Sequence, residues 1–184
     1  MFSALLERLA EALERAAIPY MVIGGQAVLL HGEPRLTRDV DLTLGVDVDR
    51  LPDVLAAARG CRLEPLVDPE DFVNKTMVLP CLDPESGIRV DLVFSWSPYE
   101  REAIARALTV PVGGVGVRYA TAEDLVIHKI LAGRARDLED VRGVLLKNPT
   151  LDQVRIESVL AEIGAVTSEA LVDRFRAIVN DIET

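Results

Sequence analysis

Polar and apolar residues alternate in the segment Asp39-Val40-Asp41-Leu42-Thr43-Leu44. A period of two predicts a β-strand with an apolar face and a polar face. On the polar face, Asp39 and Asp41 follow each other at a Cα separation of roughly 6.5–7 Å. Two carboxylates at that spacing can reach one cluster of hard cations such as Mg²⁺, and a cation would neutralise their mutual repulsion.

The same three letters occur a second time, in Asp47-Val48-Asp49. This copy lies at the start of a predicted helix that ends at Gly60, where aspartates cap free N–H groups and suit the helix dipole. The second copy is therefore interpreted as structural, and an Asp-x-Asp pattern indicates a site only in a suitable context.

A third carboxylate lies in a second strand pattern, Ile88 to Phe94. Ile88, Val90, Leu92 and Phe94 share the apolar face, so Asp91 projects from the opposite one. If the two strands are neighbours, three carboxylates converge, and two metal ions about 3.5–4 Å apart could bind there and support phosphoryl chemistry. The alternative is a surface aspartate paired with Arg89.

The pair Gly24-Gly25 separates a predicted strand, Tyr20 to Ile23, from a short predicted helix, Gln26 to Leu30. Glycines let a backbone approach a phosphate closely, and a helix N-terminus presents free N–H groups to it. The alternative is a tight turn without a ligand.

A polar segment precedes the two aspartates. Its members Arg35, Thr37 and Arg38 either offset the acidic charges and hold phosphate oxygens, or lie in a solvated loop.

The remaining periodicities predict a mixed sheet with helices first and a helical portion last. We expect an α+β fold with one domain over residues 1–147 and a helical extension over 148–184 packed on it. The further predicted elements are a helix over 3–17, a strand over 77–81, a helix over 99–108, a hairpin over 109–119, and helices over 125–132, 137–146, 151–163 and 168–182.

Composition excludes several classes of protein. The chain has 184 residues, 49% of them hydrophobic, and a net charge of −10, with 30 acidic against 20 basic residues. Such a charge repels phosphate backbones, so broad nucleic-acid affinity is not expected. The two cysteines, Cys61 and Cys81, have no paired spacing typical of a disulfide framework or a zinc site. No apolar run approaches the roughly 18 residues of a membrane span, so we expect a cytoplasmic protein without a membrane partner.

Two stretches carry a resemblance to a known family. The first comprises Gly24-Gly25-Gln26-Ala27, then His31-Gly32, then Arg35 to Leu42; the second runs from Glu123 to Val141. Together they resemble the active-site signature of the nucleotidyltransferase superfamily, and most closely its AbiEii-like branch, which includes toxin components of bacterial toxin–antitoxin systems. The likeness covers Tyr20 to about Leu146.

The resemblance implies a nucleotidyltransferase fold and a role for each matching residue. Gly24 and Gly25 would form the phosphate-binding turn, where many members carry Gly-Ser instead. Asp39, Asp41 and Asp91 would hold Mg²⁺ or Mn²⁺, with Asp91 acting as ligand or base.

The second stretch adds Lys129, which would contact the triphosphate or nucleotide of the NTP substrate. Arg134, Asp137 and Asp140 either shape the site or tie two helices together as ion pairs on a solvated face.

The predicted activity is metal-dependent transfer of an NMP from an NTP to a hydroxyl of tRNA, protein or a small molecule. A toxin of this kind would have an antitoxin protein as partner. Two alternatives are a non-catalytic module that binds a nucleotide or an antitoxin, and an adenylyltransferase of the aminoglycoside-modifying kind.

Four further residues are weaker candidates. His128 is expected to be packed, and His31 lies at the possible edge of the site. Trp96 and Tyr99 either stack on a base or pack in the core.

Overall fold

The computed structural model describes residues 1–95 and 97–183. The chain divides into two compact units. Unit 1 comprises Met1–Gln26 and Thr37–Ala120, and unit 2 comprises Ala27–Leu36 and Thr121–Thr184. The boundary predicted at residues 147 and 148 falls inside unit 2. These are packing units, and the predicted division into domains stays a prediction.

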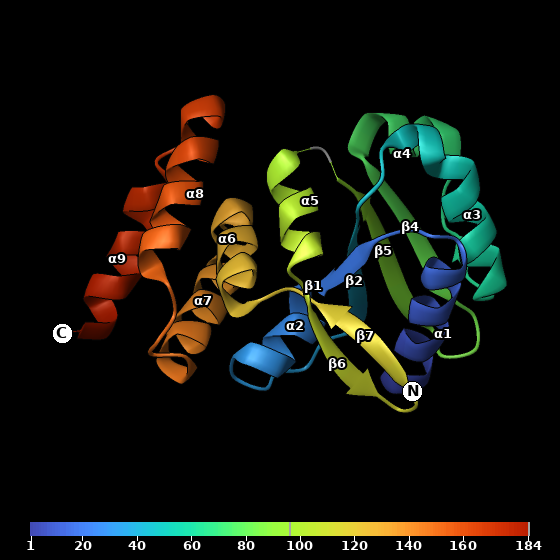
Figure 1. Cartoon of the computed structure of the whole chain (residues 1–184), viewed down its shortest axis with the longest axis horizontal. Coiled ribbons are helices and arrows are strands. Elements are labelled where there is room, and N and C mark those ends of the chain that lie inside the picture. Colours follow the sequence, from blue (N-terminus) through green and yellow to red (C-terminus); the bar gives the residue numbers. More distant parts are fainter. Residues whose placement is uncertain (96, 184) are drawn as a thin grey trace. The chain divides into compact units, whose positions relative to one another are not determined.

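Unit 1 is built on one mixed sheet of seven strands in the order β3-β4-β5-β2-β1-β7-β6 (Figure 1). The pairs β2–β5 and β1–β7 are parallel, and the other neighbours are antiparallel. This confirms the predicted mixed sheet. The strands are β1 (Tyr20–Ile23), β2 (Asp39–Leu44), β3 (Glu64–Pro65), β4 (Val78–Asp83), β5 (Ile88–Phe94), β6 (Leu108–Val112) and β7 (Val115–Tyr119).

The sheet separates an apolar face from a polar one. Val40, Leu42 and Leu44 of β2 are fully buried, and they lie beside Val90, Leu92 and Phe94 of β5 on the same face. The alternating residues of both strands, among them the three aspartates singled out above, therefore share the opposite face. Burial of the apolar face fixes the register, because a slip by one residue would bury the aspartates.

Helices flank the sheet within unit 1. The first, α1 (Phe2–Arg15), buries a stripe of leucines and packs on β7 and on α3. On the polar face of the sheet, Ala103 and Ile104 of α5 pack on Met21 of β1. The helices are α1, the 3₁₀ helix η1 (Val48–Arg50), α3 (Leu51–Gly60), α4 (Pro69–Thr76) and α5 (Pro98–Ala105); α2 (Gly24–His31) begins in unit 1 and ends in unit 2.

Two elements of unit 1 were not predicted. β3 has only two residues, which is too short for a periodic pattern. α4 has eight residues, of which only Val73 is buried, so it shows no apolar stripe. Its one sequence signal was Asp68-Pro69 at the start, where the Asp68 side chain accepts a hydrogen bond from the backbone N–H of Asp71.

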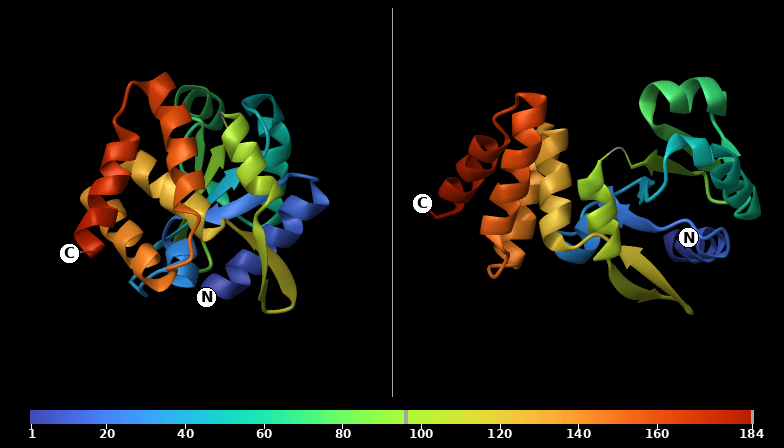
Figure 2. Two further views of the ribbon diagram at one scale, coloured as in Figure 1. Left: turned by 60° about the vertical axis from the view of Figure 1, so that its left-hand side comes forward. Right: turned by 45° about the horizontal axis from the view of Figure 1, so that its top comes forward.

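In unit 2, the C-terminal helices pack against one another (Figures 1 and 2). Thr121 caps the first of them by accepting a hydrogen bond from the N–H of Asp124, and Gly133 ends it with a φ of 63°. The buried side chains of Ile156, Leu160 and Phe175 fill the interior. This confirms the predicted C-terminal helical portion. The helices are α6 (Ala122–Ala132), α7 (Ala135–Lys147), α8 (Gln153–Thr167) and α9 (Leu171–Glu183).

None of the helices formed by the described residues combines the length and the hydropathy that a membrane crossing requires.

Candidate active site

The three aspartates lie on one face of two adjacent strands. In the parallel pair β2–β5, Asp41 lies beside Asp91, and Asp39 lies beside Arg89. Paired residues in neighbouring strands point to the same side, and the strands are about 4.8 Å apart. The condition set by the sequence, that the two strands be neighbours, is therefore met, and three carboxylates share one face.

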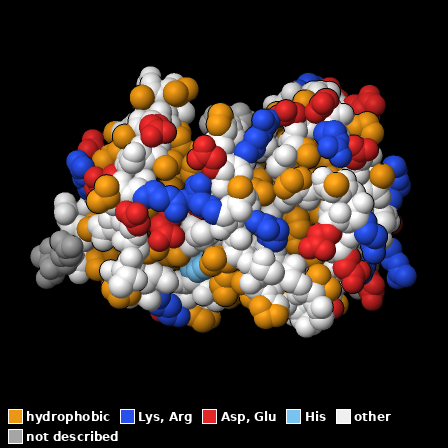
Figure 3. Space-filling model, viewed as in Figure 1, with side chains coloured by type: hydrophobic (Ala, Val, Ile, Leu, Met, Phe, Trp, Pro, Cys, Tyr) orange, Lys and Arg blue, Asp and Glu red, His pale blue; other side chains and the backbone are white. Residues whose placement is uncertain are grey.

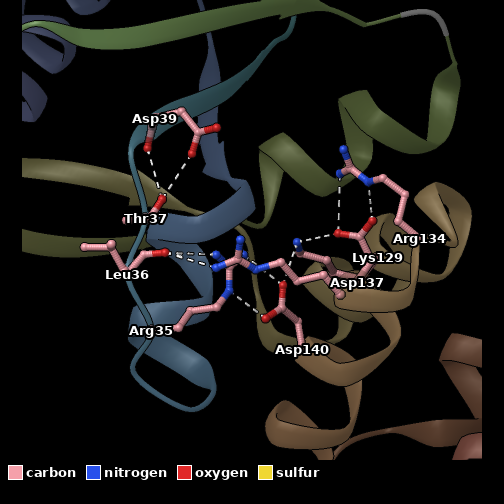
Figure 4. A network of polar contacts seen from close by, with 9 residues as sticks. Arg35, Leu36, Thr37, Asp39, Lys129, Arg134, Asp137 and Asp140 are labelled. Atoms are coloured by element: carbon pink, nitrogen blue, oxygen red, sulfur yellow. Dashed lines mark hydrogen bonds and ion pairs between the residues drawn. The ribbon is translucent and has the colours of Figure 1, made fainter.

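Asp39 is held by a residue two positions before it. The hydroxyl of Thr37 donates a hydrogen bond to Oδ1 of Asp39 over 3.1 Å (Figure 4). Thr37 is buried, while the neighbouring Arg38 is exposed. Thr37 thus orients a carboxylate, and the phosphate-binding roles proposed for Thr37 and Arg38 stay predictions.

Gly24 lies directly against the second aspartate. Its φ is +62°, and a Cβ added to it would lie 1.9 Å from Oδ2 of Asp41. This position therefore requires glycine for two reasons, its left-handed backbone and the space that the carboxylate takes. Gly25 is buried and lies in the first turn of α2. The turn that the sequence associated with phosphate thus adjoins Asp41.

Asp91 already has a cationic partner. Nε of Arg89 donates a hydrogen bond to Oδ1 of Asp91 over 2.9 Å, which is the ion pair that the sequence offered as an alternative. The pKa of Arg89 is raised, first by this hydrogen bond and by the charge of Asp91, and further by the charges of Asp39 and Asp41. The guanidinium therefore lies in the field of all three carboxylates.

The donor set fits a hard divalent cation. Mg²⁺ prefers carboxylate oxygens as ligands, and the carboxylates of Asp39, Asp41 and Asp91 share this face. In the side-chain arrangement over residues 1–95 and 97–183, no group of three His, Cys, Asp or Glu residues is already gathered as a coordination shell. Asp91 is paired with Arg89, and the metal-binding roles of the three aspartates stay predictions.

The second Asp-x-Asp copy, Asp47-Val48-Asp49, makes different contacts from the first. Asp47 precedes η1, and its Oδ1 accepts a hydrogen bond from Arg101 over 2.6 Å. The predicted cap was wrong in detail, because no side-chain hydrogen bond from Asp47 caps the helix. This copy remains a useful comparison for the first one.

The remaining predicted residues meet in unit 2, in a network of alternating charge (Figure 4). Nζ of Lys129 on α6 lies 2.7 Å from Oδ1 of Asp137 and 2.9 Å from Oδ2 of Asp140, both on α7. Arg35 contacts both oxygens of Asp140, at 2.7 and 2.9 Å, and Nε of Arg134 lies 2.6 Å from Oδ2 of Asp137. Three cations thus share two carboxylates, which leaves one net positive charge.

Most of this network is buried. The side chain of Lys129 is 7% exposed and those of Asp137 and Asp140 are 3% and 4% exposed, whereas that of Arg134 is 78% exposed. Burial by itself raises the pKa of both aspartates, but hydrogen bonds from the arginines and from Lys129 outweigh it, so the pKa of each is lowered. Both carboxylates are therefore ionised at neutral pH. The ion pairs of both aspartates with Lys129 do join α7 to α6, but the solvated face predicted for them is wrong, because both carboxylates are buried.

Helix α7 also holds the loop that precedes β2. Asn148 donates to the carbonyl of His31 over 2.7 Å, Lys147 to that of Gly32 over 2.9 Å, and Arg136 to that of Leu36 over 3.2 Å. None of these three donors was predicted from the sequence. Their only signal was the run of basic and amide residues along one helix, which is equally typical of a solvated face.

The structure describes three of the four weaker candidates, His31, Tyr99 and His128. Burial lowers the pKa of His128 to about 4, so its imidazole is neutral at pH 7. Tyr99 packs against the cluster around Met21 and Ile104, and Cζ of Arg106 lies 5.6 Å from the centroid of its ring, in a cation–π contact. Trp96 lies outside the described residues. His31 ends α2, and its role at the edge of the site stays a prediction.

Comparison with known proteins gives one family and one fold. A family model described as "Nucleotidyltransferase of unknown function (DUF6036)" matches residues 2–180. Among solved structures, the chain is similar to an antigenic nucleotidyltransferase-like protein from Paracoccidioides brasiliensis, with a TM-score of 0.57 and 20% identity over 95% of this chain and 92% of that one. A comparison with curated protein sequences gives no match.

The antibiotic-resistance factor ANT(2'')-Ia is similar to a comparable degree. Its solution structure has a TM-score of 0.56 and 17% identity over 98% of this chain and 94% of that one. Its crystal structure in complex with adenylyl-2''-tobramycin has a TM-score of 0.56 and 17% identity over 95% of this chain and 97% of that one. These similarities confirm the predicted nucleotidyltransferase fold, while the AbiEii-like branch stays a prediction.

We expect Gly24→Ala to destabilise the protein more than Gly87→Ala. Both glycines have positive φ, but a Cβ at Gly87 meets no atom within 4 Å. Gly87→Ala should cost about 1 kcal/mol in unfolding free energy, and Gly24→Ala at least about 1 kcal/mol more, because its Cβ overlaps the Asp41 carboxylate. Urea denaturation measures both; equal losses would contradict the close approach of Gly24 to Asp41.

We expect Lys129→Met to destabilise the protein by about 3–5 kcal/mol, because it leaves two buried carboxylates short of a cation. Lys75→Met is the matched control, since Lys75 forms an equally short ion pair with Asp71 but both side chains are 68% exposed. The control should cost less than about 1 kcal/mol. If urea denaturation at pH 7 gives similar losses for both variants, the network does not stabilise unit 2.

The lowered pKa values of Asp137 and Asp140 predict an acid limit for stability. A carboxylate whose pKa is lower in the folded state stabilises the protein above the unfolded pKa of about 4, and this contribution is lost as pH falls through the folded pKa. The unfolding free energy of the wild type should therefore fall more steeply below pH of about 4 than that of Asp137→Asn/Asp140→Asn. Denaturation curves at several pH values between neutrality and this acid range test it; parallel profiles would refute the assignment.

Proposed function

The chain belongs to the nucleotidyltransferase family DUF6036, and on this basis we propose that it transfers an NMP from an NTP to an acceptor hydroxyl, using Asp39, Asp41 and Asp91 around Mg²⁺ or Mn²⁺. The observation that carries this proposal is the parallel pairing of β2 with β5, which sets Asp41 beside Asp91 on an acidic face of the sheet. Acidic side chains on one sheet face repel each other, and a divalent cation is the natural ligand to offset that repulsion.

Each carboxylate has a separate task in the proposed reaction. Asp39, oriented by Thr37, and Asp41, lying against Gly24, hold the metal. A bound divalent cation would neutralise phosphate oxygens and lower the pKa of a coordinated hydroxyl. Asp91 serves as the third ligand or takes the proton of the acceptor hydroxyl. The acceptor oxygen forms a bond to the α-phosphorus while the bond to the bridging oxygen of the β-phosphate breaks, and pyrophosphate leaves.

Backbone and basic groups bind the nucleotide in this proposal. Gly24 and Gly25 open α2, whose first N–H groups are available to phosphate oxygens. Arg38 is exposed next to Asp39. The resemblance implies that Lys129 binds the nucleotide, and Arg35, Arg134 and Asp137 are further candidates for this role. The net positive charge of the network that these residues form with Asp140 is favourable for a triphosphate.

The nature of the acceptor is a second question. A net charge of −10 favours a cationic acceptor over a polyanion such as RNA. On the face that Figure 3 shows, acidic and basic side chains are interspersed and neither sign forms a continuous field. On the basis of the net charge, a small polycationic acceptor is our first choice, and a toxin acting on tRNA or protein, with an antitoxin partner, is the second.

The test is transfer of label from each α-labelled NTP in the presence of Mg²⁺. The acceptors are an aminoglycoside panel, total RNA and cell-extract protein. Asp39→Asn/Asp41→Asn should abolish transfer, by at least about 100-fold, because it removes the charge that holds the metal. The matched control is Asp47→Asn/Asp49→Asn, which removes the same two charges from the second Asp-x-Asp copy and should transfer at the wild-type rate.

The outcomes separate the candidate functions. Label on aminoglycosides supports the small polycationic acceptor, and label on RNA or protein supports the toxin. Full activity in Asp39→Asn/Asp41→Asn would refute the assignment of the metal ligands. A folded wild type that binds Mg²⁺-NTP but labels no acceptor would favour the alternative of a non-catalytic nucleotide-binding module.

A further inference from the structure

The acidic face carries a cation of its own. β2 and β5 are described in full, and the side chains that they place on this face are those of Asp39, Asp41, Thr43, Arg89, Asp91 and Val93. Arg89 is the one basic residue in this set. It comes from the middle of the acidic cluster, since its neighbour across the strand pair is Asp39 and its hydrogen-bond partner is Asp91.

The position of Arg89 is typical of a counter-ion that can be displaced. Its side chain is 54% exposed, whereas that of Asp91 is 21% exposed. An exposed ion pair of this kind contributes little to stability, so Arg89 can leave Asp91 at small cost. The charges of all three carboxylates nevertheless act on the guanidinium, as the raised pKa of Arg89 indicates. Arg89 can therefore separate from Asp91 at little cost in free energy, although its charge interacts with all three carboxylates.

We infer that Arg89 competes with a divalent cation for Asp91, and that it pairs with the triphosphate of a metal–nucleotide complex when the cation binds Asp91. This inference rests on the proposed function and assigns a positioning and substrate-binding role to a residue outside the metal-ligand set. A divalent cation has a higher charge density than a guanidinium, so it binds the Asp91 carboxylate in place of Arg89. The planar guanidinium group of the released arginine matches the geometry of phosphate oxygens.

The two halves of this role have opposite signs. Without nucleotide, the charge of Arg89 repels the metal and competes with it for Asp91, so Arg89 weakens the binding of a free cation. With a triphosphate present, the same charge attracts the ligand and strengthens its binding. A residue that only supports the strand would change neither affinity selectively, and a residue that only helps to shape the metal site would change both in one direction.

The experiment measures two affinities in Arg89→Met. Mn²⁺ alone, titrated by electron paramagnetic resonance, should bind about three- to ten-fold more tightly than in the wild type, which is the size expected for one exposed charge beside a divalent cation. Inorganic triphosphate at saturating Mn²⁺, titrated by calorimetry, should bind more weakly by a similar factor. Inorganic triphosphate carries no base, so the result does not depend on which NTP the enzyme prefers.

Two further variants keep the test specific. Arg101→Met is the matched control, because Arg101 is 53% exposed and forms an ion pair with Asp47 of the second Asp-x-Asp copy; it should leave both affinities at wild-type values. Arg89→Lys keeps the charge and should retain more triphosphate affinity than Arg89→Met. If Arg89→Met does not fold, as judged by circular dichroism, Arg89→Gln replaces it with the same expectations.

Failure of this inference differs from failure of the proposed function. If the wild type binds Mn²⁺ and Asp39→Asn/Asp41→Asn does not, but Arg89→Met shows wild-type affinities or changes both in the same direction, only the role of Arg89 is overturned. If the wild type and Asp39→Asn/Asp41→Asn bind Mn²⁺ equally weakly, the metal site itself is overturned, and the role of Arg89 with it.

Discussion

The parallel pairing of β2 with β5 is the constraint on which the candidate site depends. Its register is held by the burial of Leu42 and Leu92 on one face, and the same register sets Asp41 beside Asp91 on the other. The hydrophobic core thus determines where the carboxylates lie, even though none of them belongs to it. Both neighbours of this pair, β1 and β4, are antiparallel to it, and β1 leads directly into the turn at Gly24.

The elements with strong periodicity could be predicted from the sequence. The strand over 88–94 and the polar face with Asp39 and Asp41 follow from alternation alone. Pairing between strands does not, because β5 lies beside β2 although about 50 residues separate them along the chain, and local pattern carries no information on partners. Gly24 was predicted to lie in a phosphate-binding turn or in a turn without a ligand, and its contact with the Asp41 carboxylate was not predicted, since that contact depends on tertiary structure.

The partners of ion pairs cannot be predicted from a local sequence pattern either. The spacing of Asp137 and Asp140 placed both on one helix face, but their partners Lys129 and Arg35 lie on α6 and in the loop before β2. Only the fold shows that the carboxylates are buried and ionised. Such a network confers geometric specificity, because each buried charge tolerates few arrangements of its partners.

The loop before β2 is held in an unusual way. Three side chains of α7 and its C-terminal end bind main-chain carbonyls, those of His31, Gly32 and Leu36. Every residue type offers the same carbonyl oxygen, so this attachment does not depend on which side chains the loop carries. These three contacts therefore persist when the side chains of His31, Gly32 or Leu36 are exchanged, but they are lost when the donors on the helix are exchanged. The sequence requirement for this part of the loop's conformation thus lies on the helix that contacts it, at positions 100 to 117 residues further along the chain.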